Sequence, residues 1–393
     1  MTIPDTQRYI PSLDGLRAGA VALVIAAHFG LDGFVPGGFG VTAFFWISGF
    51  LITGQLLGEL QATGRLDFGR FYLRRMLRLM PAALFYIAVA GLVFTLVAGP
   101  MPLPAWLSAI FYGANYYDLY VGFPDASSEA QNPLTHLWSL AVEEHFYIIW
   151  PIALVFLARR RLSLATLVVV IVAVLAWRVW LFHACFPGGH PGPPGGVCGV
   201  KVEYRLYKST DTRLDSIAWG ALVAVMAAGS ARGLLQRLVD NRVVQIAALL
   251  LLIATFGFRG AEFREAWRYS AQGLALCVLI PAVCGNESLV RRMLEWPISV
   301  SIGRLSYSLY LWHWGALQWA EFYAPNSRLT QAALASVLTL VGALVSYYAV
   351  ERPMVRLRRL AGSHATTTLV TPVPAGPVLA RLGDAPGSVR IPR

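Results

Sequence analysis

The sequence predicts an all-α, polytopic membrane protein with about ten transmembrane helices and both termini in the cytoplasm. Of its 393 residues, 56% are hydrophobic and only 13% are charged, whereas an ordinary soluble domain is about 25% charged. The mean hydropathy is +0.57. So little polar surface cannot coat a soluble globule, which excludes a cytosolic enzyme, a disordered protein and a secreted disulfide scaffold.

Ten apolar segments are the predicted spans. A helix needs about 20 apolar residues to cross a bilayer. In chain order the segments are 16–30, 39–57, 80–98, 136–157, 162–182, 214–228, 243–258, 270–284, 297–319 and 330–350. The segment 103–117 is apolar but short, and we interpret it as re-entrant or as lying at the membrane interface.

The basic residues favour this count. Lys and Arg total 32 against 21 Asp and Glu, which gives a net charge of +11. They lie in short groups between the apolar segments, and with the N-terminus inside most groups fall in cytoplasmic loops. Counting 103–117 as a full span would move the arginine triplet 159–161 outside. We therefore expect a multi-pass protein of the inner (cytoplasmic) membrane, in contact with the lipid bilayer and with no nucleic-acid partner.

Two further features concern cysteine and the C-terminus. Cys185 and Cys198 bracket the loop FPGGHPGPPGGV on the predicted outer side, a compartment that permits disulfides. We expect a bridge between them, and the alternative is two free thiols. Residues 361–393 turn to Pro, Ala, Gly and Thr and are predicted to form a disordered cytoplasmic tail. The membrane domain is then 1–360.

Ionisable residues inside apolar spans are costly and usually mark a pathway or a site. The first span carries Asp14, Arg17 and His28. Arg17 and His28 are eleven residues apart, so on a regular α-helix they share a face and lie roughly 16 Å apart. One alternative is a buried histidine with satisfied hydrogen bonds and an arginine that extends to the headgroups.

A second group lies in HLWSLAVEEHFY, where His136 and Glu143 share a helix face and Glu144 is adjacent. Two neighbouring carboxylates must face a polar cavity or find donors. The alternative is an interfacial pair that merely solvates the helix end.

A third group is the arginine cluster of FYLRRMLRLMP, with Arg74, Arg75 and Arg78 just before the third span. The planar fork of arginine suits phosphate. From charge alone, ordinary positive-inside anchoring explains the cluster better.

Two more groups follow late in the chain. SYSLYLWHWG places Tyr307, Tyr310 and His313 inside a span, where the alternative is an aromatic belt with one packed histidine. TDTRLDSIAWG places Arg213 and Asp215 where another helix begins, on the outer side. These two side chains form an ion pair or contact a substrate.

Together these segments resemble the bacterial membrane acyltransferase family 3, the O-acetylases of lipopolysaccharide and other glycans and the acyltransferases of macrolides. The resemblance covers residues 9–353. It rests on YIPSLDGLRAGAVALVIAAH, GGFGVTAFFWISGFLI, FYLRRMLRLMP, HLWSLAVEEHFYIIWP, TRLDSIAWG, SYSLYLWHW and VERP, in the order of the family. Thr42 stands where members commonly have Asp, and His145 where Gln is common.

The resemblance implies transfer of an acyl group, usually acetyl, from acyl-CoA to a hydroxyl, with no metal. The family's arginine–histidine motif falls on Arg17 and His28. Its cytoplasmic arginine motif, proposed to hold CoA phosphates, falls on Arg75 and Arg78, with Arg74 adjacent. A neutral imidazole at His28 can then act as the general base toward the acceptor hydroxyl, or alternatively carry the acyl group.

The remaining residues have more open roles. Arg17 either stabilises the thioester oxygen or steadies the CoA arm, and Asp14 can orient Arg17. Glu143 or Glu144 sets the tautomer of His28 or binds acceptor hydroxyls. The candidate substrate-binding residues are His136, Arg213, Asp215, Tyr310 and His313. The acceptor is a cell-surface glycan, a lipid-linked sugar or similar; a macrolide is an alternative, and a transporter or flippase of lipid-linked sugars is an alternative of another class.

Overall fold

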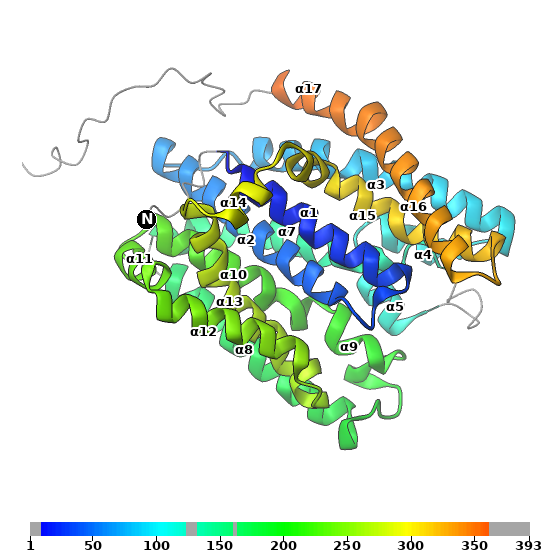
Figure 1. Ribbon diagram of the computed structural model, residues 1–393, viewed down its shortest axis with the longest axis horizontal. Helices are drawn as coiled ribbons and strands as arrows, with labels where there is room; N and C mark the ends of the chain where they lie inside the picture. The colour runs from blue at the N-terminus through cyan, green and yellow to red at the C-terminus, as the bar shows by residue number, and fades with distance from the viewer. Residues whose placement is uncertain (1–8, 123–131, 160–162, 361–393) are drawn as a thin grey trace, which may run out of the picture.

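The computed structural model describes residues 9–122, 132–159 and 163–360, and within these ranges every regular element is helical (Figure 1). The predicted tail, 361–393, lies outside the described residues. Each of the ten expected segments coincides with a long helix. These helices are α1 (Pro11–Ala26), α2 (Gly37–Thr63), α3 (Phe68–Ala98), α7 (Trp138–Arg159), α8 (Ser163–Cys185), α10 (Thr210–Ala228), α12 (Arg242–Gly257), α13 (Arg268–Gly285), α15 (Pro297–Tyr323) and α16 (Arg328–Val345).

Shorter helices connect or flank the long ones. They are α4 (Leu103–Ile110), α5 (Ala114–Tyr120), α9 (Val202–Lys208), α11 (Arg232–Asp240), α14 (Leu289–Leu294) and α17 (Arg352–Leu360). Three π-helical turns interrupt the regular helices, at Ala27–Leu31, Phe263–Trp267 and Ser346–Glu351.

Among the described residues, seven helices are long and apolar enough to cross a membrane, or eight if the pair Val202–Ala228 and Arg232–Asp240, bent by 111°, is one span. The protein is therefore a multi-pass membrane protein. Helix α12 is shorter than a typical span, and α15 carries many polar residues along its 27-residue length. The total of ten spans and the side on which the termini lie stay predictions.

The expected short segment 103–117 is not one helix. The chain forms α4 and α5, and between them Tyr112 adopts a left-handed backbone conformation, with φ of 57°. Two helices of eight and seven residues are each too short to cross a bilayer.

Helix α3 begins twelve residues before the predicted start of its span. Asp67 precedes the helix, and its side chain accepts a hydrogen bond from the backbone N–H of Arg70. The arginine cluster therefore lies on the first turns of a continuous helix rather than in a loop.

Close packing fixes α1 against α15, and the two helices run in the same direction (Figure 1). A Cβ on Gly303 of α15 would lie 1.9 Å from the backbone oxygen of Asp14, so only glycine permits this crossing. Further along both helices, the side chain of His28 contacts that of His313. The far ends of α1 and α15 are thus held together.

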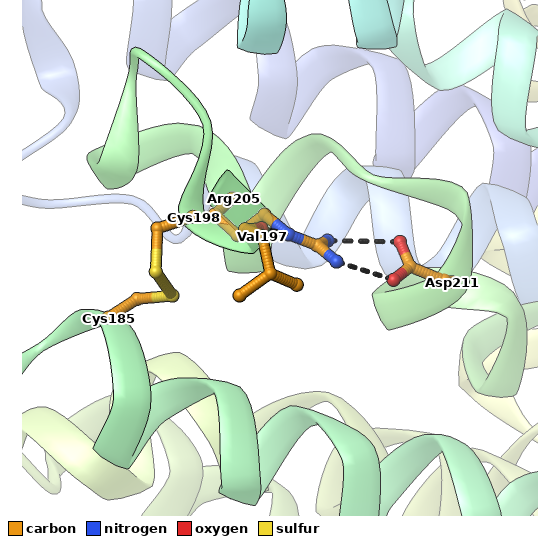
Figure 2. The surroundings of a disulfide bond; sticks show 5 residues. All are labelled: Cys185, Val197, Cys198, Arg205 and Asp211. Atoms are coloured by element: carbon orange, nitrogen blue, oxygen red, sulfur yellow. Dashed lines mark hydrogen bonds and ion pairs between the residues drawn. A yellow bond between two sulfur atoms is a disulfide. The ribbon is translucent and has the colours of Figure 1, made fainter. Parts of the chain in front are cut away.

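A disulfide joins Cys185, at the end of α8, to Cys198, as the sequence predicts (Figure 2). Next to it, the side chain of Arg205 donates to the backbone oxygen of Val197 and forms two hydrogen bonds with the carboxylate of Asp211. The bridge and this ion pair hold the Gly/Pro-rich loop to α9 and α10.

Candidate active site

Three arginines converge on one pocket of about 80 Å³ between α1, α2, α3, α7 and α15. We name it the arginine pocket, after Arg17, Arg75 and Arg78; Glu143 and Tyr310 also line it. Sequence spacing did not predict that Arg17 lies beside Arg75 and Arg78. Spacing relates residues of the same helix, whereas Arg17 is on α1 and the other two arginines are on α3.

The positive charge in the arginine pocket is only partly compensated. The guanidinium of Arg75 lies 3.6 Å from the ring centre of Tyr147. The hydroxyl of Tyr147 contacts Ser48 and donates to the carboxylate of Glu143 at 3.2 Å. The Nε atoms of Arg17 and Arg75 are buried without a hydrogen-bond partner. Buried donors without partners are costly, so an anionic ligand in the pocket would satisfy them.

Two residues expected near these arginines have other partners. Arg74 lies 3.4 Å from the carboxylate of Glu59 and does not line the pocket. Asp14 accepts a hydrogen bond from the Tyr9 hydroxyl at 2.7 Å and lies 3.8 Å from Nε of Arg304. The expectation that Asp14 orients Arg17 is therefore wrong, because its carboxylate faces α15.

His28, His136 and His313 come together in one cluster, which we name the histidine cluster. His28 lies in the π-helical turn that follows α1, and its Nδ1 is 2.9 Å from Nε2 of His313. The His136 ring centre lies 5.3 Å from that of His313. The rings of Trp314 and His28 pack against each other in an edge-to-face arrangement, with ring centres 5.0 Å apart.

The hydrogen bonds of this cluster define which nitrogen of His28 can accept a proton. Nδ1 of His313 lies 2.5 Å from the backbone oxygen of Tyr310, which can only accept. In a neutral ring, Nδ1 of His313 then carries the hydrogen and Nε2 is the acceptor. Nδ1 of His28 donates to that acceptor, so the lone pair of His28 lies on Nε2.

The structure corrects the expected role of the glutamates. The Nδ1 partner of His28 is His313, not Glu143 or Glu144. Glu143 is on α7, seven residues after His136, and belongs to the arginine pocket. The expectation that a carboxylate sets the tautomer of His28 is therefore wrong, because the π-helical turn directs the ring toward α15.

Tyr310 separates the two regions. Its side chain lines the arginine pocket, and its hydroxyl lies 2.6 Å from the Ser139 hydroxyl and 3.0 Å from the backbone oxygen of His136. Its ring centre is 5.2 Å from that of His313. The arginine pocket thus ends at a tyrosine that is itself packed against the histidine cluster.

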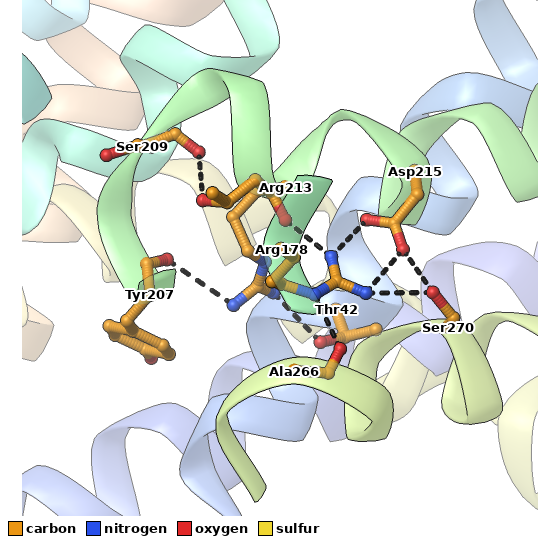
Figure 3. Close-up of polar contacts among 9 residues, drawn as sticks. Thr42, Arg178, Tyr207, Ser209, Arg213, Asp215, Ala266 and Ser270 are labelled. Carbon is orange, nitrogen blue, oxygen red and sulfur yellow. Dashed lines mark hydrogen bonds and ion pairs between the residues drawn. The ribbon is translucent and has the colours of Figure 1, made fainter. Parts of the chain in front are cut away.

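Arg213 and Asp215 are fully buried, and both belong to the polar contacts drawn in Figure 3. Asp215 pairs with Arg178 of α8, not with Arg213. Arg213 donates to the Thr42 hydroxyl at 3.1 Å, and its guanidinium lies 3.9 Å from the ring centre of Tyr269. The ion pair that spacing suggested between Arg213 and Asp215 is not formed, and neither residue lines the arginine pocket.

Sequence reasoning missed Arg178. The signal was present, since it is a lone charged residue in the apolar segment 162–182. In the described ranges, no group of three or more His, Cys, Asp or Glu side chains is arranged to hold a metal ion.

Comparison with known proteins decides the family. A family model described as an acyltransferase domain matches residues 10–348. The chain belongs to this acyltransferase family. It is 32% identical over 364 residues to the O-acetyltransferase OatA of Staphylococcus aureus strains COL and MRSA252, an alignment that covers 88% of this chain and 57% of each relative. The acyltransferase chain thus spans little more than half the length of these relatives. No solved structure matches it.

Proposed function

We propose that this family member is an integral-membrane O-acyltransferase. It moves an acyl group, in our proposal an acetyl group, from acyl-CoA to a hydroxyl of a cell-surface glycan or lipid-linked sugar. The family and the named activity of the OatA relatives support an O-acyltransferase. The observation that carries the mechanism is the chain from the Tyr310 carbonyl through His313 to His28, which leaves Nε2 of His28 as a base.

In this proposal the acyl-CoA donor binds at the arginine pocket. Phosphate oxygens of CoA accept hydrogen bonds from Arg17, Arg75 and Arg78, and the spare Nε donors of the first two support this. Arg17 therefore steadies the CoA. The pocket ends at Tyr310, so the thioester reaches His28 only when that side chain rotates away from Ser139.

The chemical step is a direct transfer. The acceptor oxygen attacks the thioester carbonyl carbon while Nε2 of His28 takes the hydroxyl proton. The carbon–sulfur bond then breaks, and the proton passes from His28 to the leaving thiolate of CoA. A positioned general base of this kind contributes typically about 10²–10⁴-fold in rate. His313 keeps the Nδ1 proton of His28 in place throughout.

The domain and its location follow from the same proposal. Residues 1–360 form the acyltransferase domain in the inner (cytoplasmic) membrane. The arginine pocket then faces the cytoplasm, where acyl-CoA is made, and this agrees with the arginine-rich loops on that side of the predicted topology.

The experiment that tests this proposal separates an enzyme from a transporter. The full chain is purified into lipid vesicles and incubated with acetyl-CoA, a thiol reagent and a panel of sugar acceptors. We expect release of free CoA that the acceptor stimulates. Proton-driven uptake of the sugar without release of CoA would contradict the proposal, because the histidine cluster would then be a proton relay.

A further inference from the structure

A second cavity of about 170 Å³ lies at the other end of α15 from the arginine pocket. We name it the distal pocket. It is lined by Phe94 and Val97 of α3, Pro133, and Gln318, Trp319, Glu321 and Phe322 of α15. None of them lines the arginine pocket or belongs to the histidine cluster.

The distal pocket lies about one helical turn along α15 from Trp314, which packs against the proposed catalytic histidine. The ring of Trp314 contacts His28, and its Nε1 donates to the backbone oxygen of Asn132 at 2.9 Å. Pro133 follows Asn132 in the chain. Gln318 is four residues beyond Trp314, which is about 6 Å along α15. A ligand in the pocket would therefore lie roughly one helical turn from the level of His28.

Hydrogen bonds connect the distal pocket to the disulfide-bonded loop. The backbone N–H of Val200, two residues after Cys198, donates to the backbone oxygen of Leu119. The neighbouring Asp118 accepts hydrogen bonds from Lys208 and from Thr135, two residues after Pro133. Because disulfides form outside the cytoplasm, this end of the protein is the extracytoplasmic one in our topology.

The lining combines aromatic faces with polar groups that lack partners. Gln318 is half-buried and Glu321 is exposed, and among the described residues neither the amide nor the carboxylate has a hydrogen-bond or ion-pair partner. The rings of Trp319 and Phe322 lie beside them in the sequence. A sugar ring matches this combination, since its C–H face stacks on an aromatic ring and its hydroxyls bond to an amide and a carboxylate. A hydrocarbon chain would cover both polar groups, remove them from water and offer them no hydrogen-bond partner.

We propose that the distal pocket is the binding subsite for a sugar ring of the acceptor, held by Gln318 and Glu321 with one hydroxyl directed toward His28. This inference rests on the proposed function, because it supplies the acceptor for the acyl transfer. It also separates the two substrates: the donor enters at the arginine pocket and the acceptor at the opposite end.

The test uses direct labelling of the full chain. A diazirine derivative of N-acetylglucosamine is photolysed with the purified protein, and the labelled peptides are mapped by mass spectrometry. We expect saturable labelling at 94–97 or 318–322. Gln318→Ala combined with Glu321→Ala should reduce it about tenfold, the loss expected for about 1.4 kcal/mol of hydrogen bonding. Glu203→Ala, a matched change of an exposed carboxylate on α9, should leave it unchanged.

Two results would overturn the inference. One is labelling that maps elsewhere or that the double variant does not reduce. The other is labelling of the distal pocket by a diazirine fatty acid in preference to the sugar probe, which would make it a lipid site. Sugar labelling needs no acyl-CoA, so this inference can fail while acceptor-stimulated CoA release still supports the proposed function. Saturable labelling at 318–322 without CoA release would support the subsite and count against the transfer reaction.

Discussion

Arg178 and the arginines of the arginine pocket show two ways in which this protein buries positive charge. All five N–H donors of Arg178 are used: Nε donates to Ala266, one terminal nitrogen to Thr212 and Asp215, and the other to Asp215 and Ser270 (Figure 3). In the arginine pocket, by contrast, the Nε atoms of Arg17 and Arg75 have no partner.

The difference shows that a buried arginine by itself does not identify a site. Arg178 and Asp215 are both 0% exposed, and their hydrogen bonds join α8, α10 and α13. Nothing there is left to bind a ligand. The arginine pocket has a cavity, spare donors and an incompletely compensated charge, which are the features expected where an anionic substrate binds.

This comparison predicts that variants of the site lose activity while the protein stays folded, and that variants of the Arg178 network unfold first. The largest effect on activity is expected for His28→Ala. Without the base at Nε2, the rate of acceptor-stimulated CoA release should fall about 10²–10⁴-fold. The measurement is the initial rate at saturating acetyl-CoA, with the melting temperature recorded beside it.

The matched control is His190→Ala, which removes an exposed histidine of the disulfide-bonded loop. Its rate should equal that of the unchanged protein. A His28→Ala variant that retains full turnover would remove His28 from the mechanism.

The largest effect on stability is expected for Arg178→Met. It leaves the buried carboxylate of Asp215 without its partner, which typically costs about 3–5 kcal/mol in the free energy of unfolding. Denaturation in detergent measures it, and Arg292→Met, a change of an exposed arginine, is the control. Unchanged stability together with lost activity would mean that Arg178 acts in the site.

A smaller effect is expected at His313. In His313→Leu, nothing accepts the Nδ1 proton of His28, and kcat should fall roughly tenfold, as for one lost buried hydrogen bond, with the KM for acyl-CoA unchanged. His313→Gln keeps an acceptor and should recover most of this loss. Equal activity of the two variants would refute the positioning role.

The smallest effect is expected for Thr42→Asp, and it is a gain. Arg213 is fully buried and bonds only to oxygen atoms without charge, those of Thr42 and Tyr207. A carboxylate at position 42 would supply the charge partner that Arg178 already has. We expect the free energy of unfolding to rise by about 1 kcal/mol. A loss of stability would show that the aromatic rings around Arg213 already compensate its charge.

The sequence predicted the helices well because long apolar runs have few alternatives in a membrane. It also predicted which cysteines pair, since Cys185 and Cys198 bracket one loop on the predicted outer side. The polar residues Arg17, His28 and Tyr310 were found from their presence in apolar segments, and Arg75 from the arginine cluster just before the third span.

The grouping of those residues could not be predicted from spacing. On a regular α-helix Arg17 and His28 would share one face, roughly 16 Å apart, but the chain leaves the α-helix at Ala27, and Gly30 adopts a φ of 101°. Arg17 lines the arginine pocket, whereas His28 contacts His313 in the histidine cluster, and the spacing did not reveal these partners on other helices. Likewise, the partner of Arg178 is 37 residues away on another helix, and no periodicity along one helix reveals it.

The most direct test of the account measures acetyl-CoA binding and turnover in the same two variants. His28→Ala should bind acetyl-CoA with an unchanged Kd by titration calorimetry, while its acceptor-stimulated release of CoA falls about 10²–10⁴-fold. Arg75→Ala with Arg78→Ala should raise the Kd about 10–100-fold, as expected for lost hydrogen bonds to a charged group, while keeping turnover at saturating donor. The opposite pattern, with weakened binding in His28→Ala or unchanged binding in the arginine variant, would contradict a donor site at the arginine pocket and a base at His28.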